Sequence, residues 1–306
     1  MRELSRDKFT IIGCEEEDLE LILKPNLTYW QKAWRKFLEN KGALVCIIVI
    51  LIIIIMAIIG PHLTKYKFDQ VQVKSTLKNL PPKKEYWFGT DGSGRDIFAR
   101  VWMGARGSLF IGITVTFINI TIGIIYGSIC GFFGGLIDDV TMRIVEIVVS
   151  IPSMLIIILM GMILGPGIIS IVAAMSVAGW CNIARVVRGQ IMQVKHHEYI
   201  LAAEALGANS VRIISKHLVS NIIGIAIVTI TLEIPNMIIT EMVLTYTRLI
   251  SAGNFMTWGT VGRDLGVALI IYPYQVYIPY TIICLTLVCF NIVGDALSDA
   301  LDPKLN

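Results

Sequence analysis

Charged residues are scarce in this chain of 306 residues. Asp, Glu, Lys and Arg together make up 16% of it, whereas an ordinary soluble domain carries roughly 25%. The formal net charge is only +3, and no basic patch is interleaved with aromatic residues, which argues against a nucleic-acid partner. The chain also has no Gly-x-x-x-x-Gly-Lys-Ser/Thr stretch, so it carries no recognisable phosphate loop of its own for ATP.

Residues that bind metals or act in catalysis are equally sparse. Only four histidines occur, all outside the long apolar runs, and none has the His-Glu-x-x-His spacing of a zinc enzyme. His196, His197, Glu198 and His217 fall in one polar segment, where a solvated cluster is favoured over a metal site. Five of the six cysteines lie in or beside apolar runs without paired spacing, so we expect small buried apolar side chains. A membrane-embedded enzyme is therefore a weak hypothesis.

Long uncharged runs are what the chain has instead. It is 55% hydrophobic with a mean hydropathy of +0.71, and a helix needs about 20 apolar residues to cross a bilayer. The third run is long enough for two spans and is divided by Gly165-Pro166-Gly167, which indicates a tight turn. We therefore predict an all-α polytopic membrane protein with six transmembrane helices. The uncharged runs are 43–60, 107–137, 147–184, 222–247 and 265–294.

Two details within these runs predict how the spans are shaped. Gly123, Gly127 and Gly131 recur every four residues, so they form a smooth stripe that another helix can approach closely. Pro235 predicts a kink in the fifth span.

The stretch 28–40, just before the first run, predicts an amphipathic helix. Trp30, Trp34, Phe37 and Leu38 fall on one face, with basic residues largely elsewhere. This pattern is typical of a helix that lies in the lipid headgroups. An ordinary soluble amphipathic helix is the alternative.

One polar interruption, EYILAAEALGANSVRIISKHL at 198–218, predicts two short helices around a turn. Gly207 can end the first helix in a left-handed conformation, and Asn209 or Ser210 can cap the second. The alanines leave the first helix thin enough to enter a groove on another protein, and Arg212, Lys216 and His217 add positive charge. Such a segment would pass movement rigidly to the fourth and fifth spans. A connector that merely lies on the membrane is the alternative.

The distribution of basic residues predicts which side this interruption faces. Residues 185–221 contain five Lys or Arg, whereas the turn at 165–167 contains none. Short loops rich in Lys and Arg stay in the cytoplasm. An even number of spans then places both termini in the cytoplasm as well.

The same interruption resembles the coupling motif of ABC importer permeases, E-A-A-x-x-x-G followed by I-x-L-P. Ala202-Ala203 and Gly207 match it, Leu201 replaces the glutamate, and KHLVSN at 216–221 stands where the peptide-permease branch has RHILPN. FGTDGSGRDIFARVWMGARGSLFIG at 88–112 and GDALSDALDP at 294–303 are similar to two further motifs of that branch. TEMVLTYTRLI at 240–250 is a weaker match, with Arg248 and Ile250 in place of glycines. The chain resembles the C-type membrane subunit of an oligopeptide or dipeptide ABC importer.

This resemblance implies a type I importer permease in a bacterial-type cytoplasmic membrane. A second, homologous permease would share the pathway, two cytoplasmic ATPases would carry ATP and Mg²⁺ and grip the coupling helices, and an extracellular peptide-binding protein would deliver cargo. No cofactor is expected in this chain. Import of another small solute, such as a metal chelate, and a secondary transporter are the alternatives. The residues expected to dock the ATPase are Tyr199, Ala202, Ala203, Leu206, Gly207, Arg212, Lys216 and His217.

The predicted organisation follows from these assignments. It comprises a cytoplasmic leader at 1–42 with the interfacial helix at 28–40, a first transmembrane helix at 43–60, an extracytoplasmic segment at 61–106, a permease core of five transmembrane helices at 107–296 with the coupling segment at 196–218, and a cytoplasmic tail at 297–306.

Three ionisable residues are candidates for the cavity or a gate. Glu233 and Glu241 lie two turns apart within the fifth span, where a carboxylate is costly and is by default a functional hypothesis. They either line the cavity or bond to neighbouring helices. Arg248 either meets a peptide carboxylate or extends to the headgroups. A salt-bridged cap before the second span is also predicted, formed by Asp91, Arg95, Asp96, Arg100 and Arg106.

Overall fold

The computed structural model describes residues 28–66, 68–69 and 77–301. Residues 1–27 of the predicted leader and 302–306 of the predicted tail lie outside this part. The described residues are helical apart from connecting segments and one isolated bridge between Thr90 and Asp96, which confirms the all-α class.

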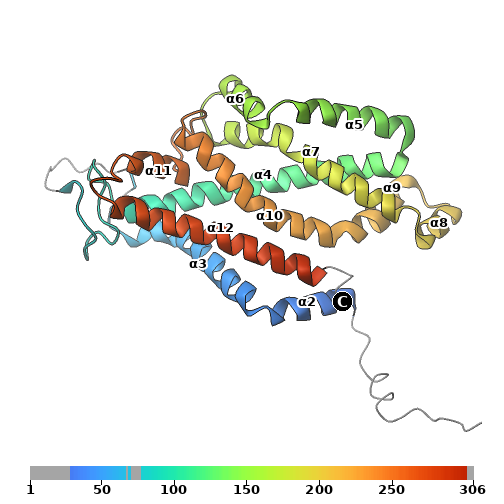
Figure 1. Cartoon of the computed structure of the whole chain (residues 1–306), viewed down its shortest axis with the longest axis horizontal. Coiled ribbons are helices and arrows are strands. Elements are labelled where there is room, and N and C mark those ends of the chain that lie inside the picture. Colours follow the sequence, from blue (N-terminus) through green and yellow to red (C-terminus); the bar gives the residue numbers. More distant parts are fainter. Residues whose placement is uncertain (1–27, 67, 70–76, 302–306) are drawn as a thin grey trace, which may run out of the picture.

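The long helices lie side by side along the long axis of the molecule (Figure 1). Figure 1 places α8 and α9 at one end, called the coupling end below, and α11 at the other, called the far end. The helices are α2 (Tyr29–Glu39), α3 (Lys41–Leu63), α4 (Ile97–Phe133), α5 (Gly135–Ser150), α6 (Ser153–Leu164), α7 (Ile168–Val194), α8 (Glu198–Ala205), α9 (Ser210–Arg212), the π-helix η3 (Ile213–Leu218), α10 (Val219–Tyr246), α11 (Trp258–Gly266) and α12 (Tyr274–Leu301).

Five helical segments of the described chain are long and apolar enough to cross a membrane, namely α3, α4, α7, the continuous run 210–246 and α12. A sixth span exists if α5 and α6, which are bent by 84° at their junction, count as one. The uncharged run from residue 147 does not continue as one helix up to the turn at 165–167. α6 has only 12 residues, about 18 Å of helix, against a bilayer core of about 30 Å.

Pro152 accounts for this bend. A proline keeps the preceding residue out of the helical region, and Ile151 is extended, with φ −86° and ψ 129°. The turn predicted between α6 and α7 is confirmed, because Gly165 and Gly167 both have positive φ, at 77° and 146°.

α4 begins ten residues before the uncharged run that predicted the second span. Asp96 caps it by accepting a hydrogen bond from the Phe98 amide. Arg100, in the first turns of α4, is fully buried and ion-paired. The helix therefore begins within the predicted extracytoplasmic segment 61–106, because a buried charge with partners interrupts a hydrophobic pattern without ending the helix.

The glycine stripe of α4 packs against α7, as predicted. A Cβ at Gly123 would lie 2.6 Å from Ile183 Cγ2, and one at Gly127 would lie 2.5 Å from the Ala184 carbonyl oxygen. The two backbones approach so closely that only glycine fits, and this contact forms the centre of the bundle.

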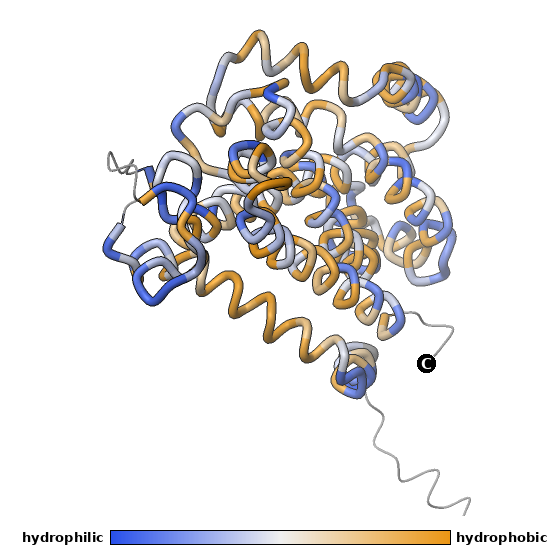
Figure 2. The backbone as a smooth tube through the Cα atoms, turned by 60° about the vertical axis from the view of Figure 1, so that its left-hand side comes forward, coloured by the Kyte–Doolittle hydropathy of each residue, from blue (hydrophilic) through white to orange (hydrophobic). Residues whose placement is uncertain are grey.

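α2 and α3 pack along the opposite side of the bundle, against α12. Figure 2 shows α3 as hydrophobic over its whole length and α2 as mixed. Phe37 of α2 is buried with Ala43, Cys46 and Val293, whereas Trp34 is 62% exposed. The predicted amphipathic helix is confirmed; its place in the headgroups stays a prediction.

Candidate functional site

The coupling segment folds as the sequence predicts. α8 ends in two hydrogen bonds, from the Gly207 amide to the Glu204 carbonyl (2.9 Å) and from the Ala208 amide to the Ala203 carbonyl (3.0 Å). This is the Schellman arrangement, which needs a left-handed residue at its centre, and Gly207 has φ +82°. The turn is therefore specified by the glycine.

The second helix of the coupling segment continues directly into the membrane. Asn209 caps it, its side chain accepting a hydrogen bond of 2.8 Å from the Arg212 amide. α9, η3 and α10 then form one helical run from 210 to 246. No loop therefore separates the turn from α10.

An apolar cluster fixes the coupling segment to the ends of α7 and α10. Ile200 of α8 and Ile213 and Leu218 of η3 are at most 1% exposed, and they pack with Ile191 and Ile222. Asn221 Nδ2 also donates a hydrogen bond of 3.2 Å to the Tyr199 hydroxyl. The segment is thus anchored to both membrane helices that flank it.

The opposite face of the coupling segment is left uncovered by this chain. Leu206 is 89% exposed and Val211 is 74% exposed. Of the eight predicted docking residues, Ala203 and His217 are half-buried, and the other six are exposed. Exposed apolar side chains on a rigid tip suit a protein contact.

The histidines of this segment form no metal site in the described chain. His196 and His197 are exposed, and the His197 ring lies edge-on to Tyr199 with centroids 5.8 Å apart. The described residues contain no group of three or more His, Cys, Asp or Glu that is placed to hold a metal.

Glu241 is fully buried and is held by hydroxyl groups. Its carboxylate accepts hydrogen bonds from Ser108 Oγ (2.6 Å) and Thr245 Oγ1 (3.0 Å), and Ser108 in turn accepts one from the Trp258 amide (2.9 Å). The carboxylate therefore joins α10 to α4 and α11. Of the two predicted alternatives for Glu241, these contacts favour bonding to neighbouring helices, because the side chain is completely covered.

Glu233 differs from Glu241 although the two lie on one helix. It is half-buried, near the middle of the 28 residues of α10, and it forms no hydrogen bond or ion pair with any residue that the structure describes. Thr229, Asn236 and Thr240 lie on the same helix face, at intervals of four and three residues. We call Thr229, Glu233, Asn236 and Thr240 the polar stripe.

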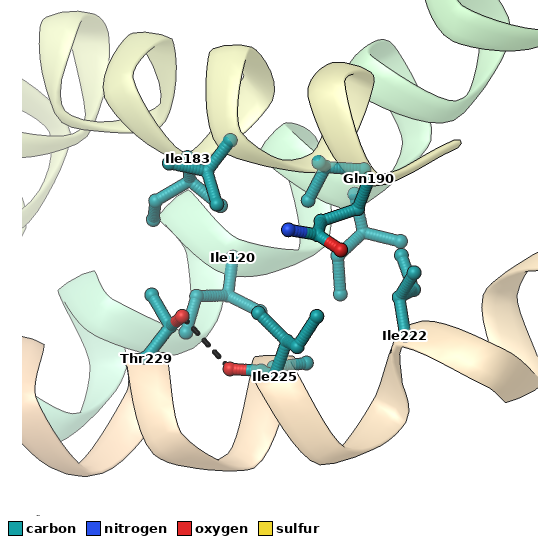
Figure 3. Close-up of a pocket in the computed structure, with 10 residues that line it drawn as sticks. Ile120, Ile183, Gln190, Ile222, Ile225 and Thr229 are labelled. Carbon is teal, nitrogen blue, oxygen red and sulfur yellow. Dashed lines mark hydrogen bonds between the residues drawn. The ribbon is translucent and has the colours of Figure 1, made fainter. Parts of the chain in front are cut away.

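A narrow cleft lies beside the start of this stripe. It separates α4, α7 and α10, and its walls include Ile120, Ile183, Gln190 and Thr229 (Figure 3). Its volume is about 10 Å³, which leaves room for about one water molecule. In this state the chain alone encloses no passage for a larger solute at this cleft.

Arg248 follows α10 at the far end. It is exposed and has φ +60°, a conformation that costs a non-glycine residue free energy. This geometry accounts for the glycine that the peptide-permease motif has at the same position. Ile250, two residues on, is buried against Gly161 of α6.

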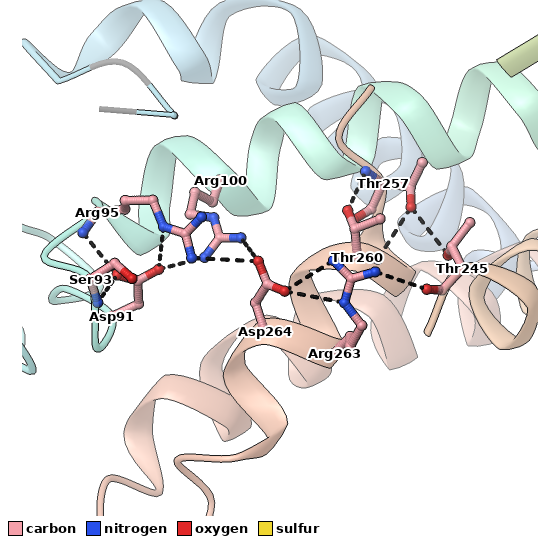
Figure 4. A network of polar contacts seen from close by, with 9 residues as sticks. All are labelled: Asp91, Ser93, Arg95, Arg100, Thr245, Thr257, Thr260, Arg263 and Asp264. Carbon is pink, nitrogen blue, oxygen red and sulfur yellow. Dashed lines mark hydrogen bonds and ion pairs between the residues drawn. The ribbon is translucent and has the colours of Figure 1, made fainter. Parts of the chain in front are cut away.

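The predicted cap at the far end exists with a changed membership (Figure 4). Arg100 donates to Asp91 (2.5 Å) and to Asp264 (2.6 Å), while Arg95 also pairs with Asp91 (2.8 Å). Arg263 pairs with Asp264 (3.1 Å). We call Asp91, Arg95, Arg100, Arg263 and Asp264 the outer cluster.

Two predicted members do not belong to the outer cluster. Asp96 caps α4, and burial raises the pKa of its carboxyl. Arg106 is exposed beside an apolar groove that includes Phe110 and Phe255. Asp264 was missed, because a sequence shows that Arg100 needs a counter-charge but not which distant carboxylate supplies it.

The charges around Asp264 set its protonation. Burial raises the pKa of Asp264, but the hydrogen bonds and charges of Arg100 and Arg263 outweigh burial and hold that pKa below its usual value. The carboxylate is therefore ionised at neutral pH, and the outer cluster links the segment before α4 to α11.

A second ion pair that sequence reasoning missed joins α5 to α7. Arg188 donates from Nε and Nη2 to the two oxygens of Asp138, each at 2.5 Å, and Asp138 is buried. Beside this pair lies an open groove of about 590 Å³ whose walls include Asp139, Arg143 and Arg185. The pair holds the bent third span against the bundle.

Comparison with known proteins shows the family. A family model described as the binding-protein-dependent transport system inner membrane component matches residues 120–306, more than half of the chain. The chain belongs to this family. A second model, the N-terminal TM domain of oligopeptide transport permease C, matches residues 28–82. This inner membrane component is thus a multi-pass membrane protein by family and by its helices.

Several curated proteins are similar to this inner membrane component over nearly their whole length. The oligopeptide transport system permease protein OppC of Bacillus subtilis is 43% identical, over 100% of this chain and 99% of its own. The dipeptide transport system permease protein DppC of the same organism is 40% identical, over 98% and 93%. OppC of Escherichia coli is 35% identical, over 90% and 91%. The resemblance inferred from the motifs is confirmed.

Proposed function

We propose that this chain is one of two membrane subunits of an ATP-driven peptide importer. The similar proteins are permeases named for oligopeptide and dipeptide transport, which favours peptides over a metal chelate or another small solute. The observation that carries the proposal is the coupling segment, an exposed apolar tip anchored to α7 and α10. A secondary transporter would give such a tip no role.

In this proposal the chain is not catalytic. Two cytoplasmic ATPase subunits bind ATP with Mg²⁺, and each grips one coupling segment, here through Leu206 and its exposed neighbours. A second permease covers the exposed face of α10, and an extracellular binding protein delivers the peptide. The coupling end faces the cytoplasm, as its basic residues indicate, so both termini are cytoplasmic.

The structure suggests how movement would pass through this chain. ATP binding draws the two ATPases together and displaces the turn at Gly207. The apolar cluster around Ile200 and Leu218 transmits this displacement to α7 and, through η3, to α10. The pathway beside α10 then opens alternately to each side of the membrane, which is what alternating access requires.

Uptake by the reconstituted complex tests the proposal. The complex of both permeases and both ATPases is placed in proteoliposomes containing ATP and Mg²⁺, and a peptide-loaded binding protein is added outside. We expect a labelled tetrapeptide to accumulate, and we expect no accumulation with ADP inside. Equal accumulation with ADP would contradict ATP-driven import and favour a secondary transporter.

A further inference from the structure

Part of α10 is poorly covered by the described chain, and this helix carries polar groups. Only 17% of the most apolar stretch of the run 210–246 is buried, against 28% to 50% for the other four spans. In the polar stripe, Asn236 is exposed, and Thr229, Glu233 and Thr240 are half-buried. Such groups are not left in contact with lipid tails, so they face a pathway or another subunit.

Glu241 shows how this chain stabilises a carboxylate that has only a structural role. That side chain is fully buried, and hydroxyls from two helices donate to its oxygens. Glu233 lies two turns away on the same membrane helix, where a carboxylate is equally costly to place. No described residue donates a hydrogen bond to it. A structural role therefore does not account for Glu233.

No cation among the described residues pairs with Glu233. The nearest Lys and Arg along the run are Lys216 and Arg248, 17 and 15 positions away by number, which is roughly 25 Å and 22 Å at helical rise. The long helices that pack on α10 are α4, α7 and α12, and they have no charged residue in 107–137, 168–184 and 274–294. α11 also packs on α10, but its Arg263 pairs with Asp264 and bonds to the Thr245 carbonyl at the far end. The part of the chain that the structure describes therefore supplies no counter-charge for this carboxylate.

The stripe also has the hydrogen-bonding groups that suit a peptide. Thr229 and Thr240 donate their hydroxyl hydrogens to carbonyls of their own helix, which leaves their oxygens as acceptors. Asn236 is exposed, and its side chain bonds to no described residue. Glu233 is the single fixed charge among these neutral groups.

We propose that the Glu233 carboxylate binds the protonated amino terminus of the transported peptide. This inference rests on the proposed function. Peptides of different sequence share only their backbone and their termini, so one charge for the amino terminus and neutral groups for the backbone recognise any of them. A single charge-assisted contact holds the cargo without trapping it, as transit requires.

Removing the charge while keeping the shape tests this site. In the reconstituted complex, uptake of tetra-alanine is compared with uptake of N-acetyl-tetra-alanine, each at a concentration that saturates the binding protein. Glu233→Gln should lower uptake of the free peptide about tenfold, the size of one lost charge-assisted hydrogen bond. Uptake of the acetylated peptide should stay within about twofold, because it carries no ammonium group.

Two further variants complete the test. Glu233→Asp keeps the charge and should restore part of the uptake of the free peptide. Glu39→Gln removes a carboxylate from the exposed surface of α2 and should change the uptake of neither peptide.

The alternative outcomes separate this inference from the proposed function. If Glu233→Gln lowers uptake of both peptides equally, or loses the second permease on purification, the carboxylate pairs with a subunit and the inference is wrong. If Glu233→Gln changes the uptake of neither peptide, the inference is also wrong. If the wild-type complex transports neither peptide, the proposed function fails and this inference fails with it.

Discussion

The two glutamates of α10 are of two kinds, one with hydrogen-bond donors inside the fold and one with no partner among the described residues. Glu241, with donors from Ser108 and Thr245, belongs to the first kind. Glu233 belongs to the second. Because both are glutamates of one helix, the effects of replacing them on protein stability can be compared directly.

Replacing Glu241 should destabilise the protein. Glu241→Leu leaves the buried Ser108 hydroxyl without its acceptor, which costs about 1–3 kcal/mol. Thr245 keeps the backbone carbonyl of residue 241 as an acceptor. Glu241→Gln keeps an acceptor oxygen and should cost less. Thermal unfolding of the purified protein in detergent measures both.

Glu233→Leu is the matched control for Glu241→Leu, because no described residue loses a hydrogen-bond partner when Glu233 is replaced. Its unfolding temperature in detergent should stay close to that of the wild type. Equal destabilisation by the two leucine substitutions would contradict the distinction between a structural and an outward-facing carboxylate.

Among the helices, the α4–α7 contact depends most on residue size. Gly127 faces Ala184 and Val187 so closely that a Cβ would lie 2.5 Å from a carbonyl oxygen. Gly127→Val should therefore force the two helices apart, at about 1–3 kcal/mol or more. Gly189 on α7 has no atom within 4 Å of its Cβ position, so Gly189→Val is the control.

The measurement is the yield and unfolding temperature of each purified variant. We expect a marked fall for Gly127→Val and little change for Gly189→Val. Comparable losses in both would mean that helix propensity, and not the closeness of α4 and α7, decides the outcome.

The outer cluster joins elements that are distant in sequence, and its strength depends on pH. The pKa of Asp264 lies below its usual value, so its ion pairs stabilise the folded state at neutral pH and are lost as the pH falls below about 4. Asp264→Asn should be less stable at pH 7 by about 2 kcal/mol.

Acidification then distinguishes the wild type from Asp264→Asn. Between pH 6 and pH 3.5 the wild type should lose more of its stability than Asp264→Asn, as measured by thermal unfolding at each pH. Parallel curves would show that Asp264 titrates alike in the folded and unfolded states.

Periodicity and turn chemistry predicted most of the elements, because they act over a few residues. Gly207 with Asn209 specified the turn of the coupling segment, and the glycines of α4 specified its packing face. The bend at Pro152 was missed because the apolar run continues through it. The pairs Arg100–Asp264 and Arg188–Asp138 were missed because they join residues that only the tertiary fold brings together.

At the scale of the whole molecule, the chain is a bundle with one exposed tip and a membrane helix, α10, that is only partly covered. The tip is fixed to α7 and α10 by buried isoleucines and a leucine. The described residues complete neither the tip nor the surroundings of Glu233. Both features are what a subunit of a larger transporter requires, and the central claim is that the tip binds an ATPase.

Purification of tagged variants from native membranes tests this claim most directly. Leu206 and Val267 are both 89% exposed, Leu206 at the coupling tip and Val267 at the far end, so Leu206→Asp and Val267→Asp form a matched pair. Wild type and Val267→Asp should bring down the second permease and the ATPases in near-equal amounts. Leu206→Asp should keep the permease and lose the ATPases about tenfold, the effect of losing a buried interface leucine. Retention of the ATPases by Leu206→Asp at the wild-type level, or their absence from the wild type, would contradict the account.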